Sequence, residues 1–243
     1  MTPSDPAAGE RRVPAVVVTG AARGLGRAFA EIAAAEGRCV VLVDREAEAL
    51  AETAAALAAG GARVQALALD LTAPGAGEAV ERRLAGWDLY CDVLVNNAGV
   101  GLLGPALDRP LAQSLAVVDL NVRALTELAL RFLPGMVARR AGGVINVSSI
   151  VARLSGPNMA IYNATKAYIR AVSLALAGEV AGTGVTLTAV YPGRMDGAFW
   201  DGLAMRRGRR FHVLPPLAPR AVAAAAWQGF REGKASVVPS LSY

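Results

Sequence analysis

The sequence predicts an α/β fold, a doubly wound parallel sheet of about seven strands with helices on both faces. Short β-branched runs alternate with stretches rich in Ala, Leu and Glu at helical spacing, and short connections join them. Strand–helix–strand units in this order favour a parallel sheet that is covered on both faces. A glycine-rich turn between the first strand and the first helix is the second indication.

The expected elements alternate along the chain. In the first half, strands are expected at 15–19, 39–43 and 63–69, and helices at 24–36 and 46–59. In the second half, strands are expected at 93–96, 144–148, 185–190 and 235–238, and helices at 111–139, 160–181 and 219–232. Two loops, 99–110 and 194–216, follow strand carboxyl ends, where ligands bind in open α/β sheets. They are the candidate substrate loops, and 194–216 is the candidate lid.

The 243 residues are expected to form one domain over 13–243, preceded by a disordered tail at 1–12. The tail has no apolar stretch typical of a secretory signal. No apolar run reaches the ~20 residues that cross a membrane. The two cysteines, Cys39 and Cys91, border expected strands and suit reduced, buried thiols, with a disulfide as the disfavoured alternative. We therefore expect a cytoplasmic protein with no membrane partner.

Composition disfavours several classes of function. The net charge is +5, but basic residues are interspersed with acidic ones, so no nucleic-acid partner is expected. The dense run of arginines at 206–210 is typical of a solvated loop, with contact to an anionic substrate tail or a carrier protein as the alternative. A lone histidine, His212, disfavours most zinc sites and a Ser/His/Asp triad, and no metal is expected.

The glycine-rich turn indicates a dinucleotide site. It runs from Thr19 to Gly26 with the spacing Gly-x-x-x-Gly-x-Gly. Small residues allow a sharp turn, and the N-terminus of the following helix favours a phosphate. The residues assigned to this site are Gly20, Arg23, Gly24, Leu25 and Gly26. A tight strand-to-helix turn without a ligand is the alternative.

The ends of the second and third expected strands predict how the nucleotide is held. Asp44 can accept hydrogen bonds from both ribose hydroxyls, which favours NAD(H) over NADP(H). Arg23 and Arg45 leave NADP(H) open, since either can pair with a 2′-phosphate. Asp70, which precedes Leu71, can meet the adenine amine, with an ordinary turn aspartate as the alternative.

Three residues form a candidate chemical site. Tyr162 and Lys166 are four residues apart in an expected helix, so their side chains emerge on one face. The neighbouring cation is expected to lower the pKa of the phenol towards neutrality, as an acid/base for an alcohol oxygen requires. Ser149 ends a strand upstream and can donate to the substrate oxygen. A helix-surface pair and a turn serine are the alternatives.

In order and spacing, these motifs resemble those of the classical short-chain dehydrogenase/reductase family over nearly the whole chain. The matching residues are Thr19-Gly20-x-x-x-Gly24-x-Gly26, Asp70, Asn96-Asn97-Ala98-Gly99, Asn121, Ser149, Tyr162-x-x-x-Lys166 and Pro192-Gly193. The resemblance implies a Rossmann-type, NAD(P)-dependent oxidoreductase that transfers a hydride between the nicotinamide and the CH–OH group of an alcohol or its ketone. A dehydratase, an epimerase or a nucleotide-sensing scaffold on the same fold stays open.

The same resemblance implies the roles of the site residues. Tyr162 would be the acid/base, Ser149 would polarise and position the carbonyl, and Lys166 would lower the pKa of the tyrosine and bind the nicotinamide ribose. Asn121 would hold a water that links the lysine to solvent. The further residues expected beside the cofactor are Asn97, Ala98, Gly99, Pro192 and Gly193. Gly197 stands where the family commonly has a threonine that bonds the carboxamide, so this chain has no hydroxyl there.

The expected substrate is a small ketone or alcohol of apolar or mixed character. The residues expected beside it are Gly101, Leu102, Val151, Met159, Met195, Phe199 and Trp200. The resemblance also implies a homodimer or homotetramer, in which the two long helices at 111–139 and 160–181 pair across a twofold axis.

Overall fold

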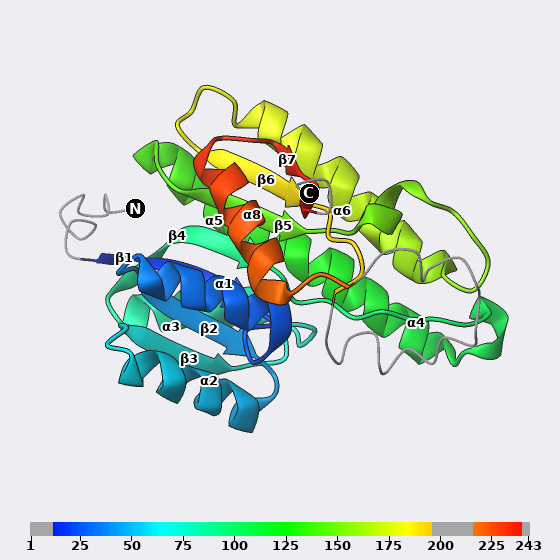
Figure 1. The fold of residues 1–243 in the computed structure, drawn as a ribbon, viewed down its shortest axis with the longest axis horizontal. Helices are drawn as coiled ribbons and strands as arrows, with labels where there is room; N and C mark the ends of the chain where they lie inside the picture. Colours follow the sequence, from blue (N-terminus) through cyan, green and yellow to red (C-terminus); the bar gives the residue numbers. More distant parts are fainter. Residues whose placement is uncertain (1–11, 196–215, 240–243) are drawn as a thin grey trace, which may run out of the picture.

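The computed structural model describes residues 12–195 and 216–239, which form a seven-stranded parallel sheet flanked by helices (Figure 1). The strand order is β3-β2-β1-β4-β5-β6-β7, and every neighbouring pair is parallel. The strands are β1 (Val13–Thr19), β2 (Cys39–Asp44), β3 (Val64–Ala68), β4 (Leu89–Asn96), β5 (Gly143–Val147), β6 (Thr186–Val190) and β7 (Ser236–Val237). The predicted doubly wound α/β fold is confirmed.

Helices cover both faces of the sheet, so the central strands are apolar along most of their length. One face carries α1 (Gly24–Ala35), α2 (Ala47–Ala59) and α8 (Pro219–Arg231). The other face carries α3 (Ala76–Gly86), α5 (Leu125–Arg139) and α6 (Ala160–Glu179). Alternate residues of β1 serve the two faces, because side chains alternate along a strand. Val16 and Val18 pack with the first group of helices, and Ala15 and Val17 with the second.

The helix expected at 111–139 has a change of geometry in its middle. It consists of α4 (Leu111–Val118), a π-helical segment η3 (Asp119–Ala124) and then α5. In a π turn the hydrogen bond spans one residue more than in an α-helix, and such segments often occur at functional sites. Since no residue type marks this change of geometry, the sequence predicted one regular helix.

Two further differences concern α3 and β4. Helix α3 was not predicted, because glycines at 75, 77 and 86 and charges in its middle weaken the helical pattern. Strand β4 begins at Leu89, four residues before its predicted start, because the half-buried polar positions Tyr90 and Asp92 obscure the apolar run. The remaining predicted strands and helices agree with the structure to within two residues at each end.

The two cysteines are buried free thiols. Cys39 of β2 and Cys91 of β4 both lie opposite Ala15 of β1, on its two sides. Two interstrand spacings separate them, which amounts to about 10 Å. That distance is too long for a disulfide.

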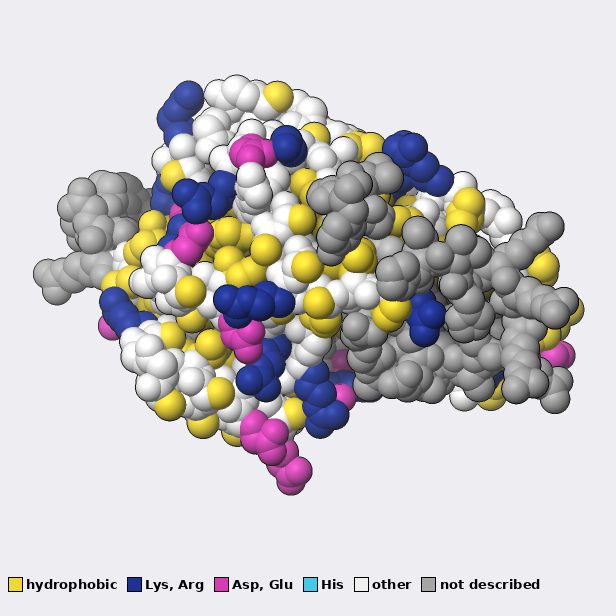
Figure 2. Space-filling model, in the orientation of Figure 1, with side chains coloured by type: hydrophobic (Ala, Val, Ile, Leu, Met, Phe, Trp, Pro, Cys, Tyr) yellow, Lys and Arg dark blue, Asp and Glu magenta, His cyan; other side chains and the backbone are white. Residues whose placement is uncertain are grey.

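Within the described part of the chain, no helix is long and apolar enough to cross a membrane. In the same residues, no group of three or more His, Cys, Asp or Glu side chains could hold a metal ion. Figure 2 shows one face of the molecule, where Lys and Arg side chains are interspersed with Asp and Glu. His212 and the arginine run at 206–210 lie outside the described residues.

Candidate active site

A cleft of about 590 Å³ opens at the carboxyl ends of the strands. The chain leads outward from β1 to β2 and β3 on one side, and from β4 to β5 and β6 on the other, so a crevice forms between β1 and β4. All the predicted cofactor residues line this cleft except Gly26, and Ser149 lines it too. The cleft therefore joins the glycine turn to the candidate chemical site.

The glycine turn depends on residues without a Cβ. Gly20 has a φ of +64° and Gly24 a φ of +56°, conformations that other residues rarely adopt. A Cβ at Gly26 would overlap the carbonyl oxygen of Gly20 and would lie 2.6 Å from Asn97 Nδ2. Because of this close approach, α1 begins directly against the turn, and its first residues Gly24 and Leu25 line the cleft. A helix N-terminus in this position suits a phosphate.

Asn97 ties the glycine turn to the end of β4. Its Nδ2 donates to the carbonyl oxygens of Thr19 at 2.9 Å and Gly20 at 3.1 Å. The Thr19 hydroxyl oxygen accepts from the backbone N–H groups of Asn97 and Ala98, both at 3.0 Å. These bonds fix the floor of the cleft between β1 and β4 before any ligand binds.

Asp44, at the end of β2, is held by two backbone donors. Its Oδ2 accepts from the N–H of Ala22 at 3.0 Å, and its Oδ1 from the N–H of Glu46 at 3.1 Å. Arg23 pairs with Glu46 at 3.2 Å, and both side chains stay more than half exposed. All four residues line the cleft. Backbone N–H groups therefore orient the carboxylate of Asp44, and Arg23 is engaged in an ion pair with Glu46.

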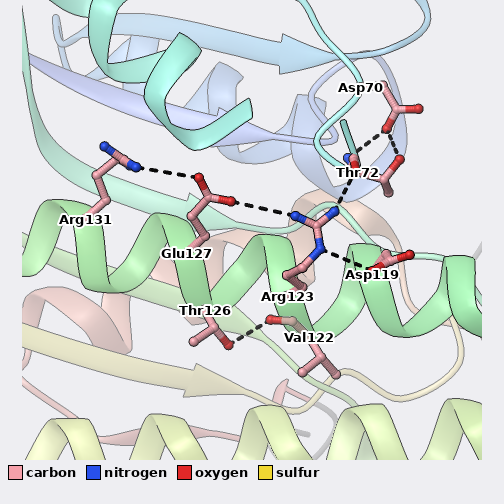
Figure 3. Close-up of polar contacts among 8 residues, drawn as sticks. All are labelled: Asp70, Thr72, Asp119, Val122, Arg123, Thr126, Glu127 and Arg131. Atoms are coloured by element: carbon pink, nitrogen blue, oxygen red, sulfur yellow. Dashed lines mark hydrogen bonds and ion pairs between the residues drawn. The ribbon is translucent and has the colours of Figure 1, made fainter. Parts of the chain in front are cut away.

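Asp70 opens the turn that follows β3. Its Oδ1 accepts from the N–H of Thr72 at 2.8 Å and from the Thr72 hydroxyl at 2.7 Å. These bonds hold the pKa of Asp70 below its usual value. Figure 3 shows the turn against the π segment, where Arg123 donates to the carbonyl oxygen of Thr72. Leu71, between them, is buried and also lines the cleft.

Ser149, Tyr162 and Lys166 come together at the other end of the cleft. Their exposed fractions are 6%, 4% and 5%. The side chains of Ser149 and Tyr162 are hydrogen-bonded to each other. Lys166 Nζ donates to the carbonyl oxygen of Val147 at 3.0 Å and lies 5.8 Å from the centre of the Tyr162 ring. The structure thus brings together the three side chains that the sequence analysis combined.

Burial sets the protonation of this group. It raises the pKa of Tyr162 to about 12, although the hydrogen bond with Ser149 acts in the lowering direction. Burial also lowers the pKa of Lys166 to about 8. The direction for Tyr162 is opposite to the expected lowering, because desolvation of the phenolate outweighs its polar contacts. The pKa of Lys166, in contrast, lies at about 8, so the charge beside the phenol changes near that pH.

Asn121 lies in the π segment and is fully buried. Its Oδ1 accepts from the N–H of Val100 at 2.9 Å, and its Nδ2 donates to the Val100 carbonyl oxygen at 2.9 Å and to Thr165 Oγ1 at 3.1 Å. A Cβ at Gly99 would lie 3.1 Å from Asn121 Oδ1 and 3.5 Å from Lys166 Nζ. Asn121 therefore connects the loop after β4 with α6, beside the lysine.

The residues expected near the substrate fall into three groups. Met195 lines the cleft. Four others do not line it: Gly101, Leu102 and Met159 lie in irregular segments, and Val151 lies in a short 3₁₀ helix over Ile150–Arg153. Phe199 and Trp200 lie outside the described residues, as do Gly197 and most of the expected lid.

Some cleft residues were not singled out from the sequence. They are Ala22, Val43, Glu46, Thr72, Leu120, Val147, Ser148 and Pro219. Most are chain neighbours of predicted site residues, so proximity to a motif was the available signal. Pro219 begins α8, far along the chain, and no local pattern marks it.

The sheet, the switch point between β1 and β4 and the glycine turn together define a dinucleotide-binding α/β protein. A family model described as short chain dehydrogenase matches residues 14–206. The chain therefore belongs to the short-chain dehydrogenase family, a membership that supports an NAD(P)-dependent oxidoreductase.

Curated relatives agree with this assignment. The chain is 38% identical over 200 residues to 1-deoxy-11-beta-hydroxypentalenate dehydrogenase of Streptomyces exfoliatus, covering 80% of this chain and 72% of that protein. It is 33% identical over 190 residues to a short chain dehydrogenase of Pseudocercospora fijiensis, covering 77% of this chain. The match spans 62% of the Pseudocercospora protein, which is less than two thirds of its length.

Solved structures of the family are also similar. A short-chain dehydrogenase from Sphingobium yanoikuyae in complex with NADPH has a TM-score of 0.86 and 31% identity, covering 95% of this chain and 89% of that one. A family protein from Burkholderia phymatum in complex with NAD has a TM-score of 0.82 and 27% identity, covering 95% and 90%. These neighbours support a nicotinamide cofactor and leave the preference between its two forms open.

A methyl group at Gly26 should disrupt the glycine turn. In Gly26→Ala the new Cβ overlaps the Gly20 carbonyl oxygen, so we expect a loss of about 2 kcal/mol in the free energy of unfolding and loss of NADH binding. Gly86→Ala is the control, since its Cβ meets no atom within 4 Å. Urea unfolding and NADH fluorescence measure the two effects. Equal NADH affinity in both variants would contradict the role of this close approach.

Lys166 should make the stability of the protein depend on pH. Its pKa is about 8 in the folded protein and about 10.4 in an unfolded chain, so between these values the unfolded state binds more protons. The free energy of unfolding of the wild type, relative to Lys166→Met, should therefore rise from pH 8 to pH 10, by up to about 3 kcal/mol.

The exposed Lys234 provides the matched control for this prediction. Lys234→Met should follow the wild-type pH dependence in chemical unfolding between pH 7 and pH 10. A Lys166→Met protein that keeps the same rise with pH as the wild type would refute the assignment of the rise to Lys166.

Proposed function

We propose that this protein transfers a hydride between a nicotinamide cofactor and an alcohol or ketone, with Tyr162 as the acid/base. The observation that carries this proposal is the buried group of Ser149, Tyr162 and Lys166 at one end of the dinucleotide cleft. A phenol and a hydroxyl that are hydrogen-bonded to each other can both reach one substrate oxygen. Membership of the short-chain dehydrogenase family supports the same reaction class.

The residues of the cleft fit a nicotinamide dinucleotide. The glycine turn at the N-terminus of α1 suits the pyrophosphate, and Asp44 is oriented to accept from a ribose. When bound, the nicotinamide supplies or accepts the hydride. The chain's own residues position the substrate and move the proton.

In the proposed mechanism, Ser149 Oγ donates to the substrate oxygen and holds it against the phenol. During ketone reduction, Tyr162 transfers its proton to that oxygen, and during alcohol oxidation its phenolate accepts the proton. A pKa of about 12 keeps the phenol protonated, which suits proton donation. A charged Lys166 5.8 Å from the ring stabilises the phenolate, and this lysine has a pKa of about 8.

Asn121 has a positioning part in this proposal. Its amide bonds Val100 and Thr165, and so fixes the loop that includes Gly99 against the helix that carries Tyr162 and Lys166. A buried amide next to the lysine is also suited to order a water between Lys166 and solvent.

The proposed cofactor is NAD(H) in preference to NADP(H). Asp44 and Glu46 place two carboxylates at the ribose end of the cleft, where a 2′-phosphate would be repelled. Arg23, the candidate partner of such a phosphate, already pairs with Glu46. Arg45 lines the same part of the cleft, and its positive charge would still attract a 2′-phosphate.

The proposed substrate is a small ketone or alcohol of apolar or mixed character, since Met195 lines the cleft and half-buried Leu102 and Met159 lie on the loops around it. We also propose a homodimer or homotetramer through the α4–α5 and α6 helices. Exposed apolar side chains on these helices support such a contact, namely Leu111, Leu115, Val118, Leu130 and Tyr168.

Removing the phenolic hydroxyl tests the mechanism. Tyr162→Phe should lower kcat for ketone reduction at least about 10³-fold, because no other group replaces the proton donor, and the Kd for NADH should stay within about threefold. Ser149→Ala should lower kcat without changing NADH binding. Turnover is followed by nicotinamide absorbance with a panel of apolar ketones. A kcat of Tyr162→Phe equal to that of the wild type would contradict the proposed mechanism.

Removing the partner of Arg23 tests the cofactor preference. The wild type should bind NADH at least about tenfold more tightly than NADPH, a difference of about 1.4 kcal/mol. Glu46→Gln should reduce this ratio several-fold, because it frees Arg23 for a 2′-phosphate and removes one repelling charge. Fluorescence titrations at equal ionic strength give both constants.

The control for this prediction is Glu48→Gln, an exposed acidic residue of α2 that does not line the cleft. It should leave the NADH to NADPH ratio unchanged. Tighter binding of NADPH by the wild type would show that Arg23 and Arg45 dominate and that the preference is wrong.

A further inference from the structure

We infer that Arg123 is a positioning residue for the cofactor: it holds the Asp70–Thr72 turn in place and so shapes the wall of the cleft that meets the adenosine half of the dinucleotide. This inference rests on the proposed function for the identity of the ligand. Arg123 does not line the cleft itself and acts through the backbone of Thr72.

The guanidinium of Arg123 bridges two parts of the chain (Figure 3). Its Nη2 donates to the carbonyl oxygen of Thr72 at 2.6 Å, and its Nε donates to Asp119 Oδ1 at 3.1 Å. Its Nη1 lies 4.0 Å from Glu127 Oε2. The two carboxylates belong to its own helix, one turn before and one turn after it. They orient the guanidinium so that its Nη2 faces the turn.

The turn that receives this bond carries the cleft residues of the β3 end. Asp70, Leu71 and Thr72 all line the cleft. The Asp70 carboxylate accepts two hydrogen bonds from Thr72, and both use its Oδ1. The orientation of the Asp70 carboxylate therefore follows the position of Thr72, and Arg123 bonds the backbone of Thr72 directly.

A second ionic contact joins the same helix to α3, which follows the turn. Arg131 bonds Glu81 of α3 at 2.7 Å, and its Nη2 lies 3.7 Å from Glu127. A Cβ at Gly77 would overlap the Glu127 carboxylate, so the glycine permits this side chain to lie against the start of α3. The helix thus holds α3 through Arg131 and the turn through Arg123. Only the Arg123 contact reaches cleft residues.

The π-helical segment η3, which carries Arg123, contacts residues at both ends of the cleft. Asn121, two residues earlier in η3, bonds the loop after β4 beside Lys166, whereas Arg123 bonds the turn after β3. One π-helical segment therefore contacts both the loop beside the lysine and the turn beside the adenosine. Loss of Arg123 should loosen the adenosine side alone.

The test compares Arg123→Met with the wild type in binding ADP-ribose, NADH and reduced nicotinamide mononucleotide. We expect the Kd for ADP-ribose and NADH to rise about five- to tenfold, in keeping with loss of one charge-assisted hydrogen bond. Binding of the mononucleotide, which lacks adenosine, should stay unchanged. Calorimetry measures ADP-ribose and the mononucleotide, and fluorescence measures NADH.

Arg131→Met is the matched control, since it removes an arginine of the same network that does not touch the turn. Arg123→Lys keeps the charge and a donor, and should restore part of the ADP-ribose affinity. Unchanged ADP-ribose affinity in Arg123→Met, or an equal loss in Arg131→Met, would overturn the inference. If Arg123→Met does not fold, ADP-ribose affinity at the wild-type level in Arg123→Lys overturns it, because an ammonium cannot bridge Asp119 and Thr72 as the guanidinium does.

Failure of the proposed function has a different signature. A wild-type protein that binds neither NADH nor ADP-ribose contradicts the proposed cofactor. A wild-type protein that binds both, with an Arg123→Met variant that binds them equally well, contradicts the role of Arg123 alone.

Discussion

The close approach of the glycine turn to the end of β4 is the constraint on which the rest of the site depends. Gly26 has no Cβ, so the Gly20 carbonyl and the Asn97 side chain can occupy the space beside it. This contact joins the two strands whose following segments diverge, β1 and β4. Since all strands are parallel, their carboxyl ends share one edge, and Asp44, Asp70 and Ser149 line the cleft along that edge after β2, β3 and β5.

Buried polar contacts between strands and helices position the other end of the cleft. Asn96 of β4 donates to Asn146 of β5 at 3.0 Å, and Asn146 donates to Ser173 of α6 at 2.9 Å. The Ser148 hydroxyl donates to the carbonyl oxygen of Lys166 at 2.8 Å. Each contact leaves one fewer unsatisfied polar atom in a dry interior, where such atoms are costly. Together they dock α6 at the register that sets Tyr162 against Ser149.

The sequence was sufficient to predict the fold class and most elements, because periodicity and glycine placement are local properties. The convergence of Ser149, Tyr162 and Lys166 could also be predicted, because their spacing puts them at a strand end and on one helix face. The pKa of Tyr162 could not be predicted in this way. Its direction depends on the balance between burial and neighbouring charge, and burial outweighs the other contributions only in the folded arrangement.

The contacts that could not be predicted from the sequence join residues that are distant in the chain. Glu46 forms an ion pair with Arg23, which lines the same cleft. Arg123 donates to the backbone carbonyl oxygen of Thr72, fifty-one positions earlier in the chain. No local sequence pattern predicts either contact. No residue type in the sequence marks the π-helical segment that carries Asn121 and Arg123. Motifs therefore identify the groups that can do chemistry, while the contacts that hold those groups in register become visible only in three dimensions.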